Sequence, residues 1–328
     1  MVDAGFSAAV ASRLTGRDLT GERPVGVDQT HESVIVAEEV VVKWLHPAVP
    51  APHPGAELLA YLTSQGYTSM PTFIGVVEHD DLVRAIVTEY IPNSLDGWDW
   101  FVDDVDAWLR GELEFDVLVG WARRMGEMIA ELHTVLGGLQ RSSVATRTYH
   151  ARAVDLLHEA MRIVEGDEGR TLRALEAPIQ KALEPLRTDR QLGAHRIHGD
   201  LHAGQFLRSG DRLYLNDFDG NPLTDDTERR LPQSPMVDMA SLLQSIDHVG
   251  RIVVKRRHPD READVSRFIT AGIQAALAAY EARHAVDRPV LRSLRVSQEL
   301  HEYHYAAAHL PRWMYVPDAA MPALLAAR

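Results

Sequence analysis

Two short motifs, at residues 197–205 and 213–222, constrain what this chain can fold into more than any other feature. The first reads IHGDLHAGQ and the second reads LYLNDFDGNP, which begins as an apolar, strand-like run. Phosphoryl transfer needs one carboxylate to orient and deprotonate the attacking hydroxyl, and further oxygen ligands to hold Mg²⁺ against the nucleotide phosphates. Asp200 suits the first role, and Gln205 and Asp217 follow at the spacing of metal ligands. The two motifs therefore predict a phosphoryl-transfer site that uses ATP and Mg²⁺.

Two positions differ from the pattern of protein kinases, whose catalytic loop reads H-x-D-x-x-x-x-N and whose metal-binding segment reads D-F-G. Gln205 stands in place of the Asn, which keeps the amide oxygen but adds a methylene. The second segment reads D-F-D-G and so carries an additional carboxylate, Asp219.

A lysine inside a strand-like run is the expected partner of these motifs. The chain has only three lysines, at positions 43, 181 and 255, against 31 arginines. Lys43 lies in VVVKWL at 40–45, a β-branched run that predicts a strand. A compact ammonium that contacts the ATP phosphates explains a lysine at this position. The alternative is an edge-strand lysine that discourages aggregation of the sheet.

Glu57 is the candidate partner of that lysine. It lies in the helix-favouring run 56–62, which follows Pro54-Gly55 and ends before Gly66. In a kinase the strand lysine is held by a glutamate on the following helix. On residue type alone, Glu57 is equally well explained as an exposed helix glutamate.

Composition limits the classes of protein to which the chain can belong. A chain of 328 residues that is 45% hydrophobic can bury a sizeable core in two lobes. The formal charge of −13 argues against a general nucleic-acid binder. We find no apolar run of membrane-spanning length and no export signal, so we expect no membrane partner. The absence of cysteine is consistent with a cytoplasmic protein.

The first ninety or so residues show strand patterns. Residues 34–36 and 40–42 predict one hairpin, and 73–77 and 82–87 predict another. Strand character ends at Pro92, where a kinase has the hinge between its lobes, and chain order alone assigns the adenine site to Glu89 and Ile91. Residues 28–33 occupy the place of the phosphate-covering loop but lack its glycines.

The rest of the chain shows helical patterns. Apolar residues recur every three or four positions from 115 to 132, and further helices are expected over 150–187, 236–249, 261–284 and 289–309. A small hairpin at 205–208 and 212–215 interrupts them. The patterns together predict an α+β, bilobal, protein-kinase-like fold, with a mostly β N-lobe at 1–92 and a mostly α C-lobe at 93–328.

The chain resembles the aminoglycoside phosphotransferase-like kinases, and among them the bacterial maltokinases and the actinobacterial glucosamine kinases. The resemblance rests on the motifs at 198–205 and 217–222 and on SPMVDMASLL at 234–243. It implies that Asp200 is the base, that Gln205 and Asp217 hold Mg²⁺, and that Lys43 with Glu57 positions the nucleotide. Asp238, near a helix start, is expected to be structural.

The same resemblance directs the search for the acceptor sugar to the C-terminal segments 298–305 and 310–317. Sugars are bound by aromatic faces and by hydrogen bonds to charged groups, and an amino sugar adds a cation that carboxylates favour. The alternative is that the Trp and Tyr residues of these segments serve only in the packing of the protein and do not bind a ligand. The predicted acceptor residues are His202, Asp219, Glu299, Glu302, Tyr305, Arg312 and Trp313.

The resemblance to glucosamine kinases implies that the product is glucosamine 6-phosphate. A maltokinase-like or aminoglycoside kinase activity is the alternative, although maltokinases carry a longer N-terminal cap. Two more distant alternatives are an inactive kinase-fold binding module and a metallohydrolase, since H-x-D-x-H at 198–202 and H-E-Y-H at 301–304 contain potential metal ligands. The sequence does not indicate an oligomeric state.

Overall fold

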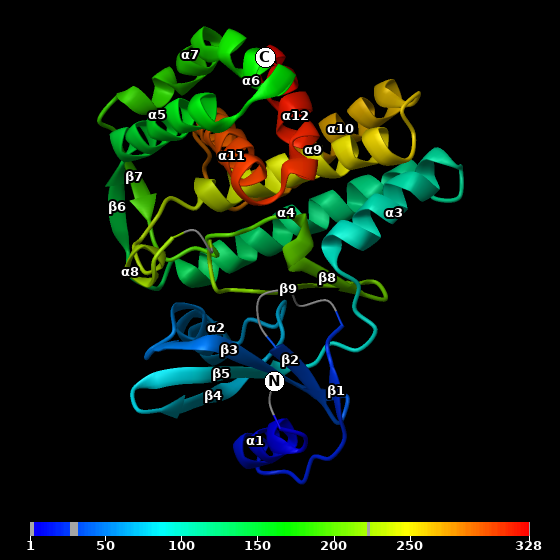
Figure 1. Ribbon diagram of the computed structural model, residues 1–328, viewed down its shortest axis with the longest axis vertical. Helices are drawn as coiled ribbons and strands as arrows, with labels where there is room; N and C mark the ends of the chain where they lie inside the picture. The colour runs from blue at the N-terminus through cyan, green and yellow to red at the C-terminus, as the bar shows by residue number, and fades with distance from the viewer. Residues whose placement is uncertain (1–2, 27–31, 222–223, 328) are drawn as a thin grey trace. The chain divides into compact units, whose positions relative to one another are not determined.

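The computed structural model describes residues 3–26, 32–221 and 224–327 (Figure 1). The chain divides into two compact units. The first holds the chain up to Asp96 together with residues 198–200 and 205–230, and the second holds 97–197, 201–204 and the chain from Leu231 onward. The predicted lobe boundary after residue 92 stays a prediction. The motif at 213–222 belongs to the first unit, whereas the motif at 197–205 is divided between the two units.

The first unit is built on a five-stranded antiparallel sheet in the order β1-β2-β3-β5-β4. Both predicted N-terminal hairpins are confirmed, as β2 with β3 and as β4 with β5. The β8–β9 hairpin is confirmed as well. The strands are β1 (Glu22–Pro24), β2 (Glu32–Val36), β3 (Val40–Pro50), β4 (Phe73–His79), β5 (Leu82–Glu89), β8 (Phe206–Ser209) and β9 (Arg212–Leu215).

The helix α2 (Pro54–Ser64) follows β3 and begins and ends where the sequence predicts. Proline at the first helical position needs no hydrogen-bond partner for its nitrogen. The ring of His53 caps this end, because its Nδ1 accepts the backbone N–H groups of Gly55 at 3.1 Å and Ala56 at 3.3 Å. The helix stops before Gly66, which has a left-handed φ of 72°.

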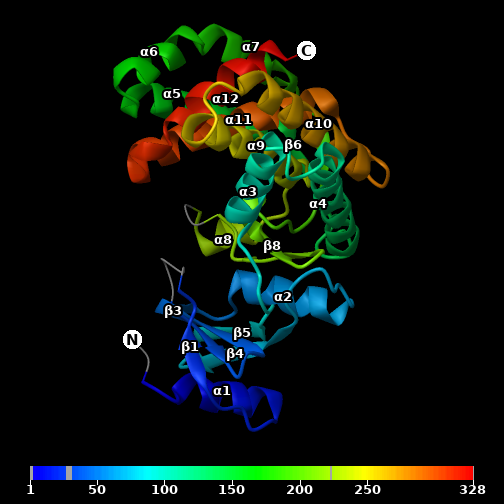
Figure 2. The same ribbon diagram turned by 90° about the vertical axis from the view of Figure 1, so that its right-hand side faces the viewer.

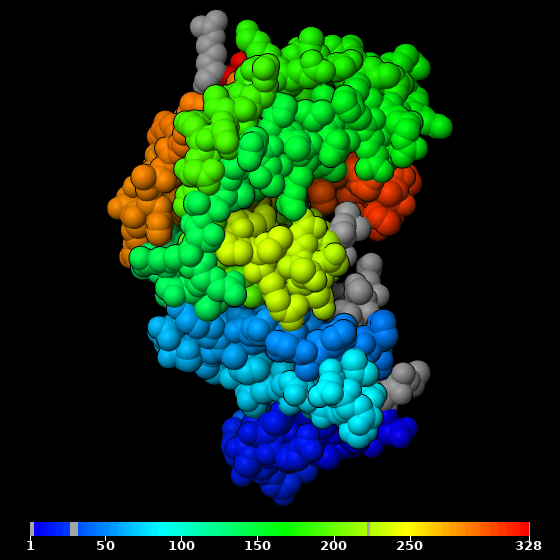
Figure 3. Space-filling view, turned by 90° about the vertical axis from the view of Figure 1, so that its left-hand side faces the viewer, coloured from blue at the N-terminus to red at the C-terminus, as the bar shows by residue number. Residues whose placement is uncertain are grey.

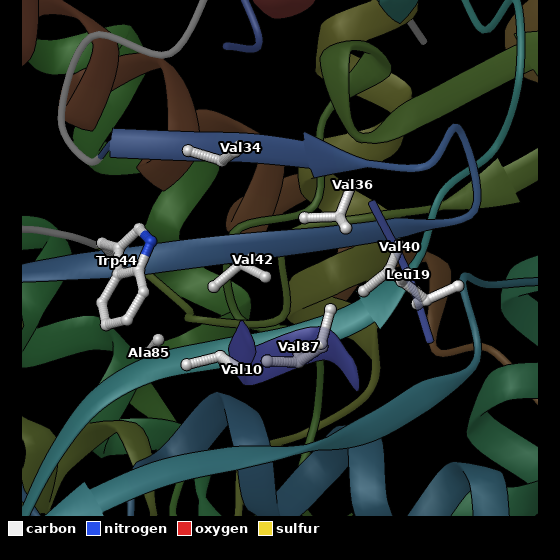
Figure 4. Packing of buried hydrophobic residues seen from close by; sticks show 10 residues of the cluster. Val10, Leu19, Val34, Val36, Val40, Val42, Trp44, Ala85 and Val87 are labelled. Carbon is white, nitrogen blue, oxygen red and sulfur yellow. The ribbon is translucent and has the colours of Figure 1, made fainter. Parts of the chain in front are cut away.

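One face of the sheet carries a valine-rich cluster and the opposite face carries Lys43. Side chains alternate along a strand, so Val42 and Trp44 point one way and Lys43 points the other. The helix α1 (Phe6–Thr15) covers the valine face, where Val10 lies near the sheet valines (Figure 4). The indole N–H of Trp44 donates to the Ser7 hydroxyl at 3.0 Å. In Figures 1 and 2, α1 and α2 lie on opposite sides of the sheet. The cluster consists of Val10, Ala11, Leu19, Val34, Val36, Val40, Val42, Trp44, Ala85 and Val87.

The second unit is a helical assembly, as the patterns predict. Five positions of the predicted core stripe on α4, Leu118, Ala122, Met125, Ile129 and Leu132, are fully buried. Three helices cover the region 150–187, as the helical pattern there indicates, and Figure 3 shows the residues of this region in green. The elements are α3 (Gly97–Leu109), α4 (Phe115–Leu136), β6 (Ser142–Ala145), α5 (Thr146–Ile163), α6 (Gly166–Ala174), α7 (Glu176–Arg187), β7 (Gln191–Ala194), α9 (Met236–Arg256), α10 (Glu262–Glu281), α11 (Arg288–His309) and α12 (Tyr315–Ala326).

Three short elements complete the fold: α8 (Asp226–Arg229), η1 (Ala203–Gln205) and η2 (Pro311–Trp313). Within the described residues, no helix has both the length and the apolarity that a membrane span requires.

Close approach of α4 and α10 depends on a glycine, and this gives a stability prediction. A Cβ added at Gly126 would overlap the backbone carbonyl of Ala276 on α10, whereas a Cβ at Gly120, on the same helix, would meet nothing within 4 Å. We expect Gly126→Ala to lower the free energy of unfolding by roughly 1–3 kcal/mol, because the helices must separate. Gly120→Ala should be neutral or stabilising by up to about 1 kcal/mol. Denaturant unfolding of both variants checks this, and equal shifts would contradict the packing argument.

Candidate active site

The loop that carries Asp200 is fastened to the segment that carries Asp217 by His198. The ring Nε2–H of His198 donates to the carbonyl oxygen of Asn216 at 2.9 Å, and its Nδ1 lies 3.4 Å from the backbone nitrogen of Asp200. The ring also packs on Phe218, with centroids 4.8 Å apart. His198 therefore links the loop of the predicted base to the segment of the predicted metal ligand. The sequence motif includes His198, but its pattern alone does not indicate this positioning role.

Gln205 and Asp217 are brought together by the β8–β9 hairpin. The last pair of the ladder is Phe206 with Leu215, and beyond it the N–H of Asn216 donates to the carbonyl of Gln205 at 2.9 Å. Asp217 has a left-handed φ of 55°, a conformation that is uncommon for non-glycine residues and concentrates at functional sites. A carboxylate and an amide oxygen are hard donors of the kind that Mg²⁺ takes. These two residues would therefore suit a magnesium ion, which would neutralise phosphate charge when bound.

Lys43 reaches the same segment from β3. Its Nζ lies 3.2 Å from Oδ1 of Asp217 and 2.8 Å from Oδ2 of Asp219. Burial alone would lower the pKa of Lys43, but the charges of the two aspartates raise it above its ordinary value. β3 lies between β2 and β5, so the edge-strand alternative for Lys43 is wrong. The structure thus joins the lysine strand and the D-F-D-G segment, as expected for a phosphate site.

Glu57 makes a different contact from the one expected. Its carboxylate accepts a hydrogen bond from Nε of Arg230 at 3.1 Å. Arg230 lies just after α8 and also donates to the carbonyl oxygens of Asp226 and Pro52. The ion pairs described for Lys43 are with the two aspartates.

The hinge residues lie at the end of β5. The N–H of Glu89 donates to the carbonyl of Thr72 at 2.8 Å, and the Glu89 side chain accepts the Thr72 hydroxyl at 2.7 Å. The N–H of Tyr90 donates to Glu39, and Ile91 is buried. Adenine binding at Glu89 and Ile91 stays a prediction. Residues 28–31 of the predicted phosphate-covering loop lie outside the described residues.

In the second unit, Trp98, His202 and Trp313 form an aromatic cluster. The rings of Trp98 and His202 are stacked with centroids 5.5 Å apart, and Trp313 meets Trp98 edge-on at 5.7 Å. A Cβ at Gly204 would lie 2.7 Å from the Trp98 ring, so glycine at this position permits the packing. Trp98 is absent from the predicted site residues. The sequence offers one indication of its role, namely that an aromatic residue follows shortly after the predicted hinge.

Glu302 joins this cluster, whereas Glu299 lies behind it. The indole N–H of Trp313 donates to Oε2 of Glu302 at 3.0 Å, and Gln298 donates to Oε1 at 3.2 Å. Glu299 is completely buried and accepts hydrogen bonds from His248, at 2.6 Å, and from the Gln244 amide.

Burial and charge set the protonation of the Glu299–His248 pair. Burial raises the pKa of Glu299, while the facing His248 opposes this. Burial would lower the pKa of His248, but Glu299 raises it to about 9. The His248 ring meets Trp313 edge-on at 6.1 Å. Glu299 thus supports the aromatic cluster through His248.

The other two predicted acceptor residues lie near the same segment. The ring contact described for Tyr305 is with His309, one turn along α11, and Arg312 is exposed on η2 immediately before Trp313. Their roles in sugar binding stay predictions. Asp238 is structural, as predicted, because it is buried in the first turn of α9 and accepts a hydrogen bond from His133 at 3.1 Å.

Three of the four ring nitrogens of the H-x-D-x-H motif contact protein groups. Those of His198 face Asn216 and Asp200, and Nδ1 of His202 accepts the N–H of Gly204 at 3.1 Å. Within the described part of the chain, no group of three or more His, Cys, Asp or Glu side chains is placed to hold a metal ion. These contacts count against the metallohydrolase alternative.

Known proteins were compared with the chain. No family model matches it. It is 38% identical to a glucosamine kinase of Streptacidiphilus jiangxiensis, over 98% of this chain and 78% of that protein. It is 36% identical to a glucosamine kinase of Mycolicibacterium smegmatis, over 93% of this chain and 80% of that protein. The chain belongs to the glucosamine kinase family.

Solved structures support this assignment and the fold. A glucosamine kinase in complex with glucosamine, ADP and inorganic phosphate superposes with a TM-score of 0.87 at 34% identity, covering 99% of this chain and 84% of that chain. A thermostable aminoglycoside phosphotransferase superposes with a TM-score of 0.53 at 10% identity, over 97% and 98% of the two chains, which shows a shared fold alone. The predicted kinase-like α+β fold is confirmed.

Proposed function

We propose that this protein transfers the γ-phosphoryl group of ATP to the 6-hydroxyl of glucosamine. The observation that carries the phosphoryl-transfer part is the pair of contacts from Lys43 to Asp217 and Asp219, which joins segments 174 and 176 residues apart. Membership of the glucosamine kinase family supports the choice of acceptor. We also propose a cytoplasmic location, because a cysteine-free chain suits a reducing compartment.

The proposed chemistry assigns one role to each residue. Asp200 orients the sugar hydroxyl and accepts its proton as the new oxygen–phosphorus bond forms, while the bond from phosphorus to the bridging oxygen breaks and ADP leaves. Lys43 offsets charge on the phosphates. Asp217 and Gln205 would hold Mg²⁺, which supplies further charge neutralisation when bound.

We assign recognition of the sugar to the aromatic cluster and Glu302. Aromatic faces suit the apolar faces of a sugar ring, and a carboxylate forms a charge-assisted hydrogen bond with an ammonium group. Of the predicted carboxylates, Asp219 contacts Lys43 at 2.8 Å and Glu299 is buried against His248. Glu302 is half-buried and contacts Trp313, so it is the best placed of the three.

This assignment predicts a preference for the amine. Glucosamine should exceed glucose and N-acetylglucosamine in kcat/KM by about 10-fold or more, because acetylation removes the cation and leaves the carboxylate without its ionic partner. Glu302→Gln should compress this ratio without changing ATP affinity. A coupled assay of ATP consumption across the three sugars, maltose and an aminoglycoside measures it.

Glu184→Gln is the matched control, because Glu184 lies on the exposed side of α7 and pairs with Arg187. We expect its ratio to equal that of the wild type. Equal efficiency on the three sugars, or a preference for maltose or the aminoglycoside, would overturn the proposed acceptor in favour of the alternatives.

A further inference from the structure

We propose that Asp219 is the residue that holds Lys43 in position for the nucleotide phosphates, in the role that a helix glutamate has in protein kinases. This inference rests on the proposed function and reassigns Asp219 from sugar binding to the positioning of Lys43. Asp217 would then act mainly as the ligand of the metal ion.

The geometry of the two ion pairs distinguishes the aspartates. Nζ of Lys43 lies closer to Asp219, at 2.8 Å, than to Asp217, at 3.2 Å. The Asp219 side chain is 17% exposed, whereas that of Asp217 is 41% exposed. Attraction between charges strengthens as distance and contact with water decrease. Asp219 is therefore the stronger anchor, and Asp217 has the free face that a metal ligand needs.

The start of α2 is shaped to accept Asp219. A Cβ at Gly55 would lie 2.6 Å from Oδ1 of Asp219 and 2.9 Å from the carbonyl oxygen of Phe218. Only glycine leaves room for the aspartate to lie against this helix. The first turn of a helix also favours a negative charge. Gly55 thus sets where Asp219 lies, and Asp219 in turn sets where Lys43 lies.

Glu57, the residue expected in this role, is engaged elsewhere. Its carboxylate binds Arg230 at 3.1 Å, and Arg230 also donates to Pro52 at the start of the loop before α2. Glu57 thereby ties α2 to the segment after α8. Asp219, the additional aspartate of D-F-D-G, makes the contact with Lys43 that was expected of Glu57.

The scarcity of lysine allows a direct test on the nucleotide-free protein. Lys43, Lys181 and Lys255 are the only lysines of the chain, and the last two are exposed. Labelling with an amine-reactive ester, followed by mass spectrometry of each lysine peptide, measures the three rates in one sample. We expect Lys43 to react most slowly in the wild type.

Asp219→Asn should raise the labelling rate of Lys43 by about tenfold or more, the scale of losing one hydrogen bond to a charged group, without changing the rates of Lys181 and Lys255. Asp217→Asn should raise the rate of Lys43 less. Gly55→Ala should act like Asp219→Asn, because its methyl group displaces Asp219. Gly120→Ala, a glycine-to-alanine change in open space on α4, is the matched control and should leave all three rates unchanged.

Steady-state kinetics provide a second readout. Asp219→Asn should lower kcat/KM for ATP about tenfold or more, while KM for glucosamine stays within about twofold. The loss should exceed that of Glu57→Gln. A raised KM for glucosamine with unchanged ATP parameters would return Asp219 to sugar binding and overturn the inference.

An unchanged labelling rate of Lys43 in Asp219→Asn, or a larger increase in Asp217→Asn, would also overturn it. Thermal unfolding of each variant reports whether it folds, and Gly55→Ala tests the same contact if Asp219→Asn does not. Labelling requires neither ATP nor a sugar, so its result does not depend on the proposed function. If the labelling rates change as expected but the protein phosphorylates none of the sugars, the proposed function is wrong and the role of Asp219 stands.

Discussion

Asp200→Asn is expected to lower kcat by at least about 10²-fold while leaving nucleotide affinity nearly unchanged. The amide is isosteric with the carboxylate but cannot take a proton from the sugar hydroxyl. The loop should keep its conformation, because the contacts of His198 with the backbone nitrogen of residue 200 and with the carbonyl oxygen of Asn216 do not depend on the substituted side chain. Initial rates with glucosamine and calorimetric titration with ATP measure the two quantities.

The matched control is Asp211→Asn. Asp211 lies in the exposed turn between β8 and β9, so the same chemical change there should leave kcat at the wild-type value. Asp200→Asn activity within a few-fold of wild type would remove Asp200 from the chemistry. A loss of nucleotide binding as large as the loss of kcat would assign it to the nucleotide site instead.

The parts of the fold that the sequence predicts are those with strong local signals. Runs rich in β-branched residues predict β2 to β5, and an apolar stripe at helical spacing predicts α4. The helices α1 and α3 were not predicted, although the apolar residues Phe101, Val105 and Leu109 of α3 recur at helical spacing. Small residues dominate α1, and α3 is rich in Asp and Trp, which are weaker helix formers. Both helices are stabilised by tertiary packing, which a local pattern does not show.

The candidate site also contains residues that local motifs predict and contacts that they do not predict. The motifs predict Asp200, Gln205 and Asp217 because local contacts join them: the β8–β9 hairpin brings Gln205 to the segment of Asp217, and His198 joins that segment to the loop of Asp200. The partner of Lys43 was expected to be Glu57 by chain order, yet the contact with Asp219 depends on the absence of a side chain at Gly55. A contact between residues 176 positions apart, permitted by a glycine elsewhere, leaves no local pattern.

The two glutamates of α11 show how packing separates neighbours. Glu299 and Glu302 are three residues apart, a spacing that can place two side chains on one helical face. The structure gives them different partners, because α9 supplies His248 to Glu299 while η2 brings Trp313 to Glu302. Because Glu299 is buried against α9, we propose a supporting role for it and a sugar-binding role for Glu302. Helical spacing alone cannot make that distinction.

Asp217→Ala is expected to abolish Mg²⁺-dependent turnover, a loss of at least about 10³-fold, because it removes the carboxylate that would hold the metal and so the charge stabilisation in the transition state. Lys43→Ala should chiefly weaken productive positioning of ATP. Turnover of glucosamine as a function of Mg²⁺ concentration measures both variants.

Backbone conformation must be separated from charge in this experiment. Asp217 has a left-handed φ of 55°, which costs roughly 1–2 kcal/mol for alanine but is tolerated by asparagine. Asp217→Asn therefore removes the negative charge while preserving the local conformation. If the carboxylate is the metal ligand, Asp217→Asn loses Mg²⁺-dependent turnover but unfolds at the wild-type temperature. Full Mg²⁺-dependent activity in Asp217→Ala would contradict the metal assignment, and activity in Asp217→Asn alone would trace the loss in alanine to the backbone.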